Sequence, residues 1–330
     1  MRKIKAGALI AVAAAALAAL AGCVSLEISA TYDNADKYSA GNQTFTSEIT
    51  EIDLNWQSGK VYVTTHDENT VTVTEENSDK LNDAKKVHTW LDGKVLHIQY
   101  CKSGEVSVIR STEKNLEVKI PKNVKLSSFK YNGSSADTSF EKFSTDFFKA
   151  ESSSGKVDVR DCTSKEFELD TSSGDIYFDC KGDAEIVTAE ASSGSVELNM
   201  GNVKSLNVST SSGEITVDAD SVKDMDLDSS SGDKSIMLKS ADTVKSNASS
   251  GKTKMTFGSM PTNTKIDASS GDVTLYVPKD SSFKADIDTS SGKFNSEIQT
   301  SKEGSTYVAG SGSCKLSVDT SSGDVDIKIA

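Results

Sequence analysis

The chain has 330 residues, of which 49 are acidic and 36 are basic, and its formal net charge is −13. A nucleic-acid-binding protein needs a basic face, and a protein held by charge on an anionic membrane needs clusters of lysine and arginine. The sequence has neither pattern, so its composition argues against nucleic acid as a partner.

The first residues have the three parts of a bacterial export signal. Residues 1–5 are basic, residues 6–20 form an Ala- and Leu-rich run, and the small residues that follow end at Cys23. The apolar run is shorter than the roughly 20 residues that a membrane-spanning helix needs. Leu-Ala-Gly-Cys resembles the lipobox of bacterial lipoproteins. We therefore predict a lipoprotein signal peptide over residues 1–22, and an exported protein that a lipid on Cys23 anchors to the extracytoplasmic side of the cell membrane.

Two further segments precede the regular part of the sequence. Residues 23–48 are polar and suit a lipidated tether. Residues 49–131 contain strand-like alternation and a corner-like Gln57-Ser58-Gly59, but their spacing is less regular than that of the later repeats. We predict that residues 49–131 form an irregular N-terminal β cap of the same fold, with a separate small β-domain as the alternative.

The tripeptide Ser-Ser-Gly recurs through residues 132–330. Seven of the eight intervals between its glycines are 19 to 21 residues long, and the last is 31. A glycine can take a positive φ angle and the serines can bond the local backbone, so each tripeptide is a candidate corner. We interpret the long last interval as a coil with an inserted loop. The glycines of the series are Gly155, Gly174, Gly194, Gly213, Gly232, Gly251, Gly271, Gly292 and Gly323.

Apolar residues alternate on both sides of each corner, as half-buried strands require. They stand two and four positions after the glycine and seven and five positions before it, while the residue three positions before it is small, as at Thr171 and Ala191. One such unit buries too little surface to be stable, but stacked units share a core. We predict an all-β fold, a parallel β-solenoid of 19–21-residue coils. After Gly232 the apolar phase begins late, at Ile236, and there we expect an irregular coil.

The segments Ser-Gly-Lys-Val-Tyr-Val at 58–63, Leu-Glu-Val-Lys-Ile-Pro-Lys at 116–122 and the Ser-Ser-Gly-Asp-Ile/Val units together resemble a bacterial adhesin-like family, a domain of unknown function with β-strand repeats. The resemblance covers about residues 49–330. It implies a β-helix-like fold on a cell-envelope protein, and in Gram-positive bacteria a link to envelope stress. The family has no defined catalytic residues, so the resemblance transfers none.

Enzymatic chemistry has little support in the sequence. Some parallel β-helices cut polysaccharides with carboxylates and basic residues, but here the histidines lie in the irregular region, and no nucleophile motif, phosphate-binding loop or zinc-ligand spacing appears. We predict that the protein is not an enzyme, and keep a polysaccharide-active β-helix as the less favoured alternative.

Acidic residues recur next to the corners, and in-register stacking would bring their carboxylates close together. Calcium, which prefers oxygen ligands, is therefore a possible cofactor, although a solvated acidic edge is the favoured interpretation. The candidate ligands are Asp170, Asp175, Asp267, Asp272, Asp319 and Asp324.

Cys162 and Cys180 follow successive corners at similar distances, so a disulfide between neighbouring coils is possible in an exported protein, with free thiols as the alternative.

Two functions remain in competition. The protein is either an adhesin-like binding and display protein for an envelope, glycan or protein ligand, or a regulatory or structural lipoprotein linked to envelope stress. The sequence does not separate the two.

Overall fold

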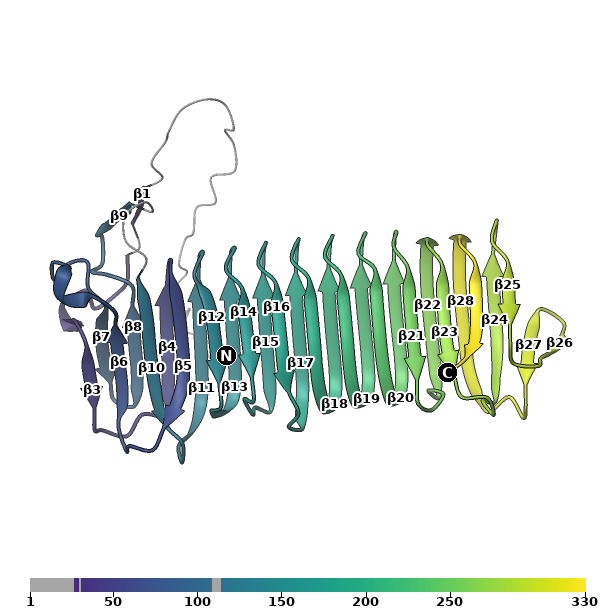
Figure 1. The fold of residues 1–330 in the computed structure, drawn as a ribbon, viewed down its shortest axis with the longest axis horizontal. Helices are drawn as coiled ribbons and strands as arrows, with labels where there is room; N and C mark the ends of the chain where they lie inside the picture. The colour runs from purple at the N-terminus through teal and green to yellow at the C-terminus, as the bar shows by residue number, and fades with distance from the viewer. Residues whose placement is uncertain (1–26, 30, 109–113) are drawn as a thin grey trace, which may run out of the picture.

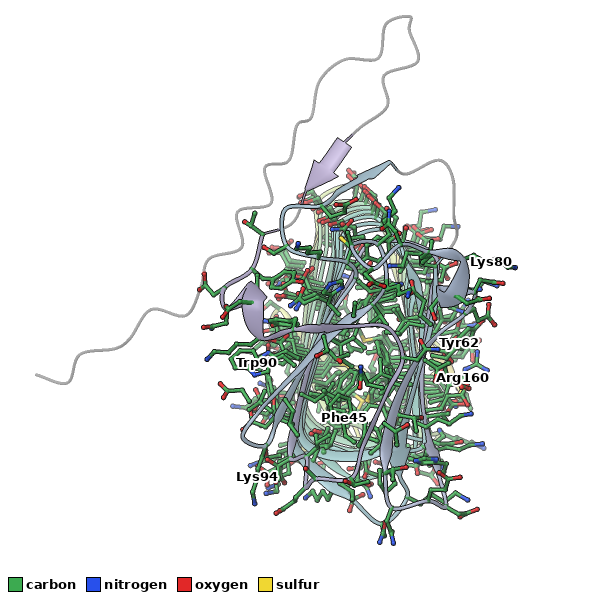
Figure 2. All side chains as sticks on the ribbon, turned by 90° about the vertical axis from the view of Figure 1, so that its left-hand side faces the viewer. Phe45, Tyr62, Lys80, Trp90, Lys94 and Arg160 are labelled. Carbon is green, nitrogen blue, oxygen red and sulfur yellow. The ribbon has the colours of Figure 1, made fainter. Side chains whose placement is uncertain are left out.

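In the computed structural model the protein is a long stack of β-coils, with residues 27–29, 31–108 and 114–330 described (Figure 1). Each coil gives one strand to each of two walls, which enclose the core between them (Figure 2). Neighbouring strands within a wall are parallel along almost the whole stack. The predicted signal at 1–22 and Cys23 lie outside the described residues.

We call the wall whose strands lead into the Ser-Ser-Gly corners wall A. Three long strands supply their second halves to it. Its members, in order along the stack, are β8 (Val95–Gln99), β4 (Glu51–Trp56), β11 (Lys125–Gly133), β13 (Ser144–Ser152), β15 (Glu166–Thr171), β17 (Ala184–Ala191), β18 (Val196–Thr210), β19 (Ile215–Ser229), β20 (Lys234–Ala248), β22 (Asn263–Ser270), β28 (Cys314–Ser322) and β24 (Phe283–Thr289).

Wall B consists of the strands that leave the corners, together with the first halves of β18, β19 and β20. In the same order its other members are β10 (Asn115–Pro121), β5 (Lys60–His66), β12 (Asp137–Glu141), β14 (Val157–Arg160), β16 (Ile176–Cys180), β21 (Thr253–Phe257), β23 (Val273–Val277), β29 (Val325–Ile329) and β25 (Phe294–Ser296).

Antiparallel strands and short helices cover the ends of the stack. At the N-terminal end these are β2 (Ser39–Ala40), β3 (Gln43–Phe45), β6 (Val71–Glu75) and β7 (His88–Asp92), with the 3₁₀ helices η1 (Ala35–Lys37) and η2 (Ser78–Lys80). A hairpin of β26 (Ser301–Glu303) and β27 (Thr306–Ala309) covers part of the C-terminal end, and β1 (Glu27–Ser29) pairs with β9 (Val106–Val108) apart from the walls.

One hydrophobic core runs through the stack. The alternation seen in the sequence holds: Val157 and Val159 of β14 are buried, as are Phe167 and Leu169 of β15. The buried cluster extends from Ile49 to Ile327 without interruption, so residues 49–131 share their core with the later coils. No helix of the described chain is long and apolar enough to cross a lipid bilayer.

The corners stack in a column, as the repeat predicts, but the reason for the glycines differs from the expected one. Among the tripeptide glycines only Gly251 and Gly271 have a positive φ angle. A Cβ atom on Gly213 would lie 1.8 Å from the carbonyl oxygen of Gly194 in the preceding coil, and Gly174 and Gly155 are related in the same way. Glycine is therefore required because the backbones of successive corners approach too closely for any side chain.

The expectation of an irregular coil after Gly232 is wrong. β20 pairs in full register with β19, and Lys234 takes the inward position that Ile215 has in the coil before. Its side chain is only 2% exposed, and its ammonium donates a hydrogen bond to the backbone oxygen of Asn247 at 2.5 Å. The long aliphatic part of lysine fills the space of an apolar residue, so the coil keeps its regular path.

The order of the coils in space differs from their order in the chain at both ends. β28 pairs with β22 on one side and with β24 on the other, so the last coil lies inside the one that precedes it in sequence. At the other end β4 likewise lies between β8 and β11. The interval of 31 residues thus contains the turn-back hairpin, and Figure 1 shows the C-terminus within the stack and not at its end.

A buried ion pair fixes the N-terminal end. The Nζ atom of Lys114 lies 2.8 Å from Oε1 of Glu75, with side-chain exposures of 5% and 0%. Trp56 donates from Nε1 to the backbone oxygen of Lys114 at 3.1 Å, and the Lys114 ammonium lies 4.0 Å from the centre of the Tyr100 ring. Burial lowers the pKa of Lys114, and the Glu75 carboxylate opposes this shift.

Candidate functional site

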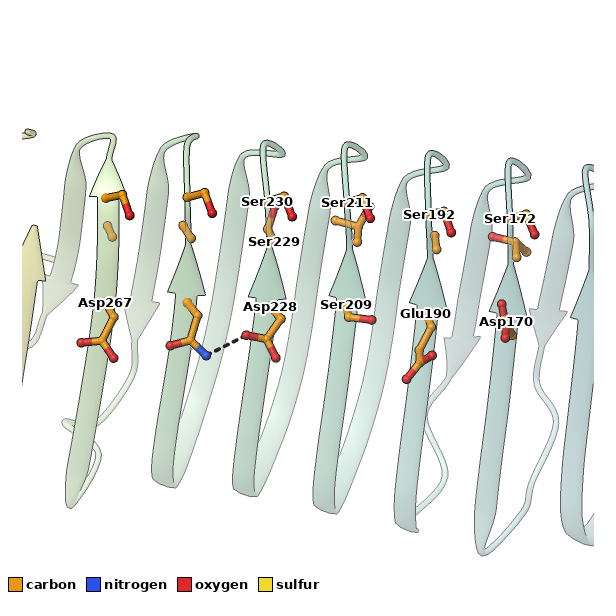
Figure 3. Close-up of a pocket in the computed structure, with 18 of the residues that line it drawn as sticks. Asp170, Ser172, Glu190, Ser192, Ser209, Ser211, Asp228, Ser229, Ser230 and Asp267 are labelled. Carbon is orange, nitrogen blue, oxygen red and sulfur yellow. Dashed lines mark hydrogen bonds between the residues drawn. The ribbon is translucent and has the colours of Figure 1, made fainter. Parts of the chain in front are cut away.

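A long groove follows wall A beside the column of corners (Figure 3). Its volume is about 880 Å³, and coils from Asp170 to Ser321 line it. The lining side chains are Ser, Thr, Asp, Glu, Asn and Ala, with no histidine, lysine, arginine or cysteine among the described residues. The groove can therefore donate and accept hydrogen bonds and attract cations, but it has no basic side chain that could activate a serine.

The residues four positions before each corner glycine form a row along this groove, which we call the acidic row. Strand pairing places each member directly beside the next, at the roughly 4.8 Å spacing of neighbouring strands. The row contains Glu151, Asp170, Glu190, Ser209, Asp228, Asn247, Asp267, Asp319 and Asp288.

Stacking of like charges has a visible effect on the acidic row. Partial burial raises the pKa of Asp170, and the neighbouring Glu151 raises it further. Asn247 interrupts the charges and donates from Nδ2 to Asp228 at 2.7 Å, the bond drawn in Figure 3. Two lysines neutralise part of the acidic row. The Nζ atom of Lys149 lies 3.0 Å from Glu151, and that of Lys265 lies 2.5 Å from Asp267. Within the part of the chain that the structure describes, Glu190, Asp228 and Asp319 have no such ion pair, so a positively charged ligand would lower the repulsion in these coils.

The small residues three positions before the glycines point inward, as predicted, and several also close the corners. Gly213 donates its backbone N–H to Oγ1 of Thr210 at 2.9 Å, and Gly232 donates to Oγ of Ser229 at the same distance. The serines that follow, such as Ser172 and Ser192, line the groove. The sequence showed that these positions are small but gave no sign of this local hydrogen bond.

The acidic residues directly after the glycines have a different role. Asp175 accepts a hydrogen bond from the backbone N–H of Ser195 at 2.8 Å, and Asp233 accepts one from Lys252 at 2.7 Å. Asp272 and Asp324 accept backbone N–H bonds in the same way. We call these residues the bridging row, because each carboxylate joins its coil to the next one.

The six candidate calcium ligands are therefore divided between two rows. Asp170, Asp267 and Asp319 belong to the acidic row, and Asp175, Asp272 and Asp324 belong to the bridging row. Within the part of the chain that the structure describes, no group of three or more His, Cys, Asp or Glu side chains is arranged to hold a metal ion.

Cys162 and Cys180 are free thiols in the structure, and the bridge that their spacing allowed is not formed. Strand pairing places Asp179 beside Arg160, so Cys180 is level with residue 161 and out of register with Cys162. Both thiols are buried, and burial raises the pKa of Cys162 to about 12. Neither thiol is an activated nucleophile.

The three histidines make local contacts in the N-terminal region. Nδ1 of His97 lies 3.4 Å from Asp53, while His88 and His66 bond the backbone oxygens of Lys86 and Thr70. Burial lowers the pKa of His88. All three positions lie outside the groove.

Comparison with known proteins identifies a family. The model of the Toastrack DUF4097 family matches residues 49–180 and 181–328, well over half of the chain. No curated protein matches the chain. The two matched segments meet after β16, where the strand pairing continues unbroken into β18.

Three solved structures, from two bacterial species, are similar to this chain at low sequence identity. A candidate adhesin from Parabacteroides distasonis is 13% identical, with a TM-score of 0.44 over 88% of this chain and 97% of that one. A candidate lipid-binding protein from the same species is 16% identical, with a TM-score of 0.41 and the same coverage. A candidate adhesin from Bacteroides fragilis is 12% identical, with a TM-score of 0.33 over 87% and 95% of the two chains. The family match decides the assignment, and the chain belongs to the Toastrack DUF4097 family.

Proposed function

We propose that the protein is a non-catalytic β-solenoid of adhesin-like type that a lipid on Cys23 holds at the outer side of the cell membrane. The observation that supports this role most directly is the groove of about 880 Å³ along wall A. It presents a corner serine in every coil and an acidic group in most of them, which suits an extended polymer better than a small substrate. The envelope-stress role has no comparable feature in its support.

The chemistry of the groove favours a ligand with several positive charges. Single exposed ion pairs contribute little, about 0–1 kcal/mol each, because water and salt screen them. A polymer that places successive cationic groups beside Glu190, Asp228 and Asp319 gains several such contacts at the entropic cost of one binding event. The serines of the corners would add hydrogen bonds. We expect the affinity of such a ligand to fall as salt is raised.

Membrane anchoring is tested in cells. Cys23→Ser should move the protein from the membrane fraction to the soluble extracytoplasmic fraction and abolish incorporation of labelled fatty acid. A variant that remains in the membrane fraction would overturn the anchoring part of the proposal.

Ligand binding is tested with the chain from residue 23 carrying Cys23→Ser, and with fluorescent oligolysine and oligoglutamate as probes. We expect oligolysine alone to bind, and Asp228→Asn with Asp319→Asn to weaken its binding about tenfold. The control, Asp242→Asn with Asp280→Asn, removes the same charge from exposed positions outside the groove and should have little effect. Equal losses in both variants would show that net charge and not the groove binds the probe.

A further inference from the structure

Wall B carries a second surface feature near the N-terminal end of the stack. Tyr62 of β5, Ser139 of β12, Asp158 of β14 and Tyr177 of β16 occupy consecutive outward positions of neighbouring strands. Three strand spacings of roughly 4.8 Å place the two tyrosines about 14 Å apart along the stack. In the end-on view of Figure 2, Tyr62 and Arg160 lie on the same side of the molecule.

Between the tyrosines lies a network of charged side chains joined by hydrogen bonds. Asp158 points outward from the wall, yet only 6% of the residue is exposed. Arg160 holds its carboxylate with two bonds, from Nε at 2.8 Å and Nη2 at 2.9 Å, and Lys156 adds a third at 2.9 Å. Burial alone would raise the pKa of Asp158, but the hydrogen bonds from Arg160 and Lys156 hold it below its usual value.

The network leaves groups available to a ligand. The Arg160 side chain is 56% exposed, so its remaining N–H groups face solvent while its orientation is fixed by Asp158. Beside it, Ser139 donates to the Glu141 carboxylate at 2.9 Å, which orients a further acceptor. A surface on which donors and acceptors are already fixed loses little entropy when a ligand binds.

The aromatic residues supply the apolar part of this surface. Tyr62 is 44% exposed, which makes it a rare case of a large aromatic side chain with an open face on this protein. The ammonium of Lys156 lies 4.1 Å from the centre of the Tyr177 ring and so holds that ring in place. Aromatic rings combined with a few fixed polar groups are the usual composition of sites for small organic ligands.

We propose that Tyr62, Asp158, Arg160 and Tyr177 form a binding site for a neutral, linear oligosaccharide that lies along the stack on wall B. The ring of a sugar has an apolar face that packs on tyrosine and hydroxyl groups that bond to Arg160, Glu141 and Lys156. Positive and negative side chains alternate here, whereas the charged residues that line the groove are all acidic, so this surface favours hydroxyl groups over a charged ligand. This inference rests on the proposed binding role and adds a ligand class and a separate surface to it.

The test uses the chain from residue 23 with Cys23→Ser and calorimetry with four probes: cellohexaose, maltohexaose, chitohexaose and oligogalacturonate. We expect at least one of the three neutral hexasaccharides to bind and the anionic probe to bind more weakly. Tyr62→Ala and Tyr177→Ala should each weaken binding about tenfold, a loss of about 1.4 kcal/mol.

Tyr276→Ala is the matched control. Tyr276 also lies on wall B with a lysine, Lys254, over its ring at 5.3 Å, but it is several coils away from Asp158. The Tyr276→Ala variant should leave binding unchanged, and the melting temperatures of all three variants report whether each is folded.

The proposal is overturned if none of the neutral probes binds, if oligogalacturonate binds best, or if Tyr276→Ala weakens binding as much as Tyr62→Ala. The groove variant Asp228→Asn with Asp319→Asn should bind the sugar normally, so failure of the groove and failure of this site give different results.

Discussion

The ammonium of Lys234 and the backbone oxygen of Asn247 form a hydrogen bond inside the core, at 2.5 Å. Burial lowers the pKa of Lys234 to about 8, and the nearby Asp228 opposes this shift. The neighbouring inward positions of wall B hold Ile215 and Thr253, so no carboxylate replaces the lost water there.

The first prediction concerns the pH dependence of stability. Because the pKa of Lys234 is lower in the folded than in the unfolded chain, the unfolded chain binds more protons between about pH 8 and 10, and stability rises with pH in that window. Below it, the buried charge costs about 3 kcal/mol. Lys234→Met should therefore stabilise the protein at pH 7, and its advantage in urea unfolding should shrink toward pH 10.

Lys245→Met is the control for this prediction, since Lys245 is exposed on the same strand, β20. It should leave both stability and its pH dependence near those of the wild type. If Lys234→Met and the wild type differ by the same amount at pH 7 and pH 10, the buried charge is not the cause.

The second prediction concerns the corner column. Gly213→Ala would place a methyl group 1.8 Å from the carbonyl oxygen of Gly194, so two corners would have to separate. We expect a loss of about 3 kcal/mol in the free energy of unfolding. Gly182→Ala is the comparison, because its methyl group would meet only the Thr163 side chain, at 3.3 Å. Thermal melting of both variants measures the difference, and comparable losses would refute the close-approach explanation.

The third prediction concerns the buried ion pair of the N-terminal end. Glu75→Gln leaves the Lys114 ammonium buried without its counter-charge, and should destabilise the protein by about 3–5 kcal/mol. Adding Lys114→Met should restore part of this loss, since both charges are then gone. Glu48→Gln is the control, because it breaks the ion pair between Glu48 and Lys94, whose side chains are 68% and 56% exposed. It should change the free energy of unfolding by less than about 1 kcal/mol. A double variant no more stable than Glu75→Gln would contradict this explanation.

The fourth prediction concerns the bridging row. Asp175→Ala removes the acceptor for the Ser195 N–H, and should cost about 1 kcal/mol, because the exposed donor loses a charged partner but can still bond to water. Asp175→Asn keeps an oxygen in the same place and should retain most of the stability. Hydrogen exchange at Ser195 gives a local measurement: faster exchange in Asp175→Ala than in Asp175→Asn is expected, and equal rates would remove the bridging role.

The repeat was enough to predict the coils because its signals are local. The apolar side chains of Val157 and Val159 and the small side chain of Thr171 each indicate a buried position. The nearly constant spacing of the glycines implies that the corners align. The acidic row could also be found, since its members stand four positions before each glycine. The spacing could not reveal that Asp170 lines the groove whereas Asp175 accepts a backbone hydrogen bond from the next coil. On the sequence alone, both residues are therefore candidate calcium ligands.

Three other features depend on contacts that no local pattern encodes. Lys234 looked like a break in the alternation, because a sequence does not show that a lysine stem can replace an apolar side chain. Tyr62 and Tyr177 are 115 positions apart in the chain, and only the register of four strands brings them into one row. The third feature is the placement of β28 between β22 and β24, which differs from their order in the chain. A repeat of nearly constant length predicts that successive coils stack in chain order, so it gives no sign of this placement.

That reversal has consequences for how the molecule is assembled and extended. The ribosome synthesises β28 after β22 and β24, yet β28 lies between these two strands, so folding cannot simply proceed in the order of synthesis. Either β22 and β24 must stay apart until β28 is available, or a pairing between them must break before β28 can insert. Ala330 donates its backbone N–H to the oxygen of Val277, within the stack. A protein fused to Ala330 would therefore project from the side of the stack and leave the end of the stack uncovered.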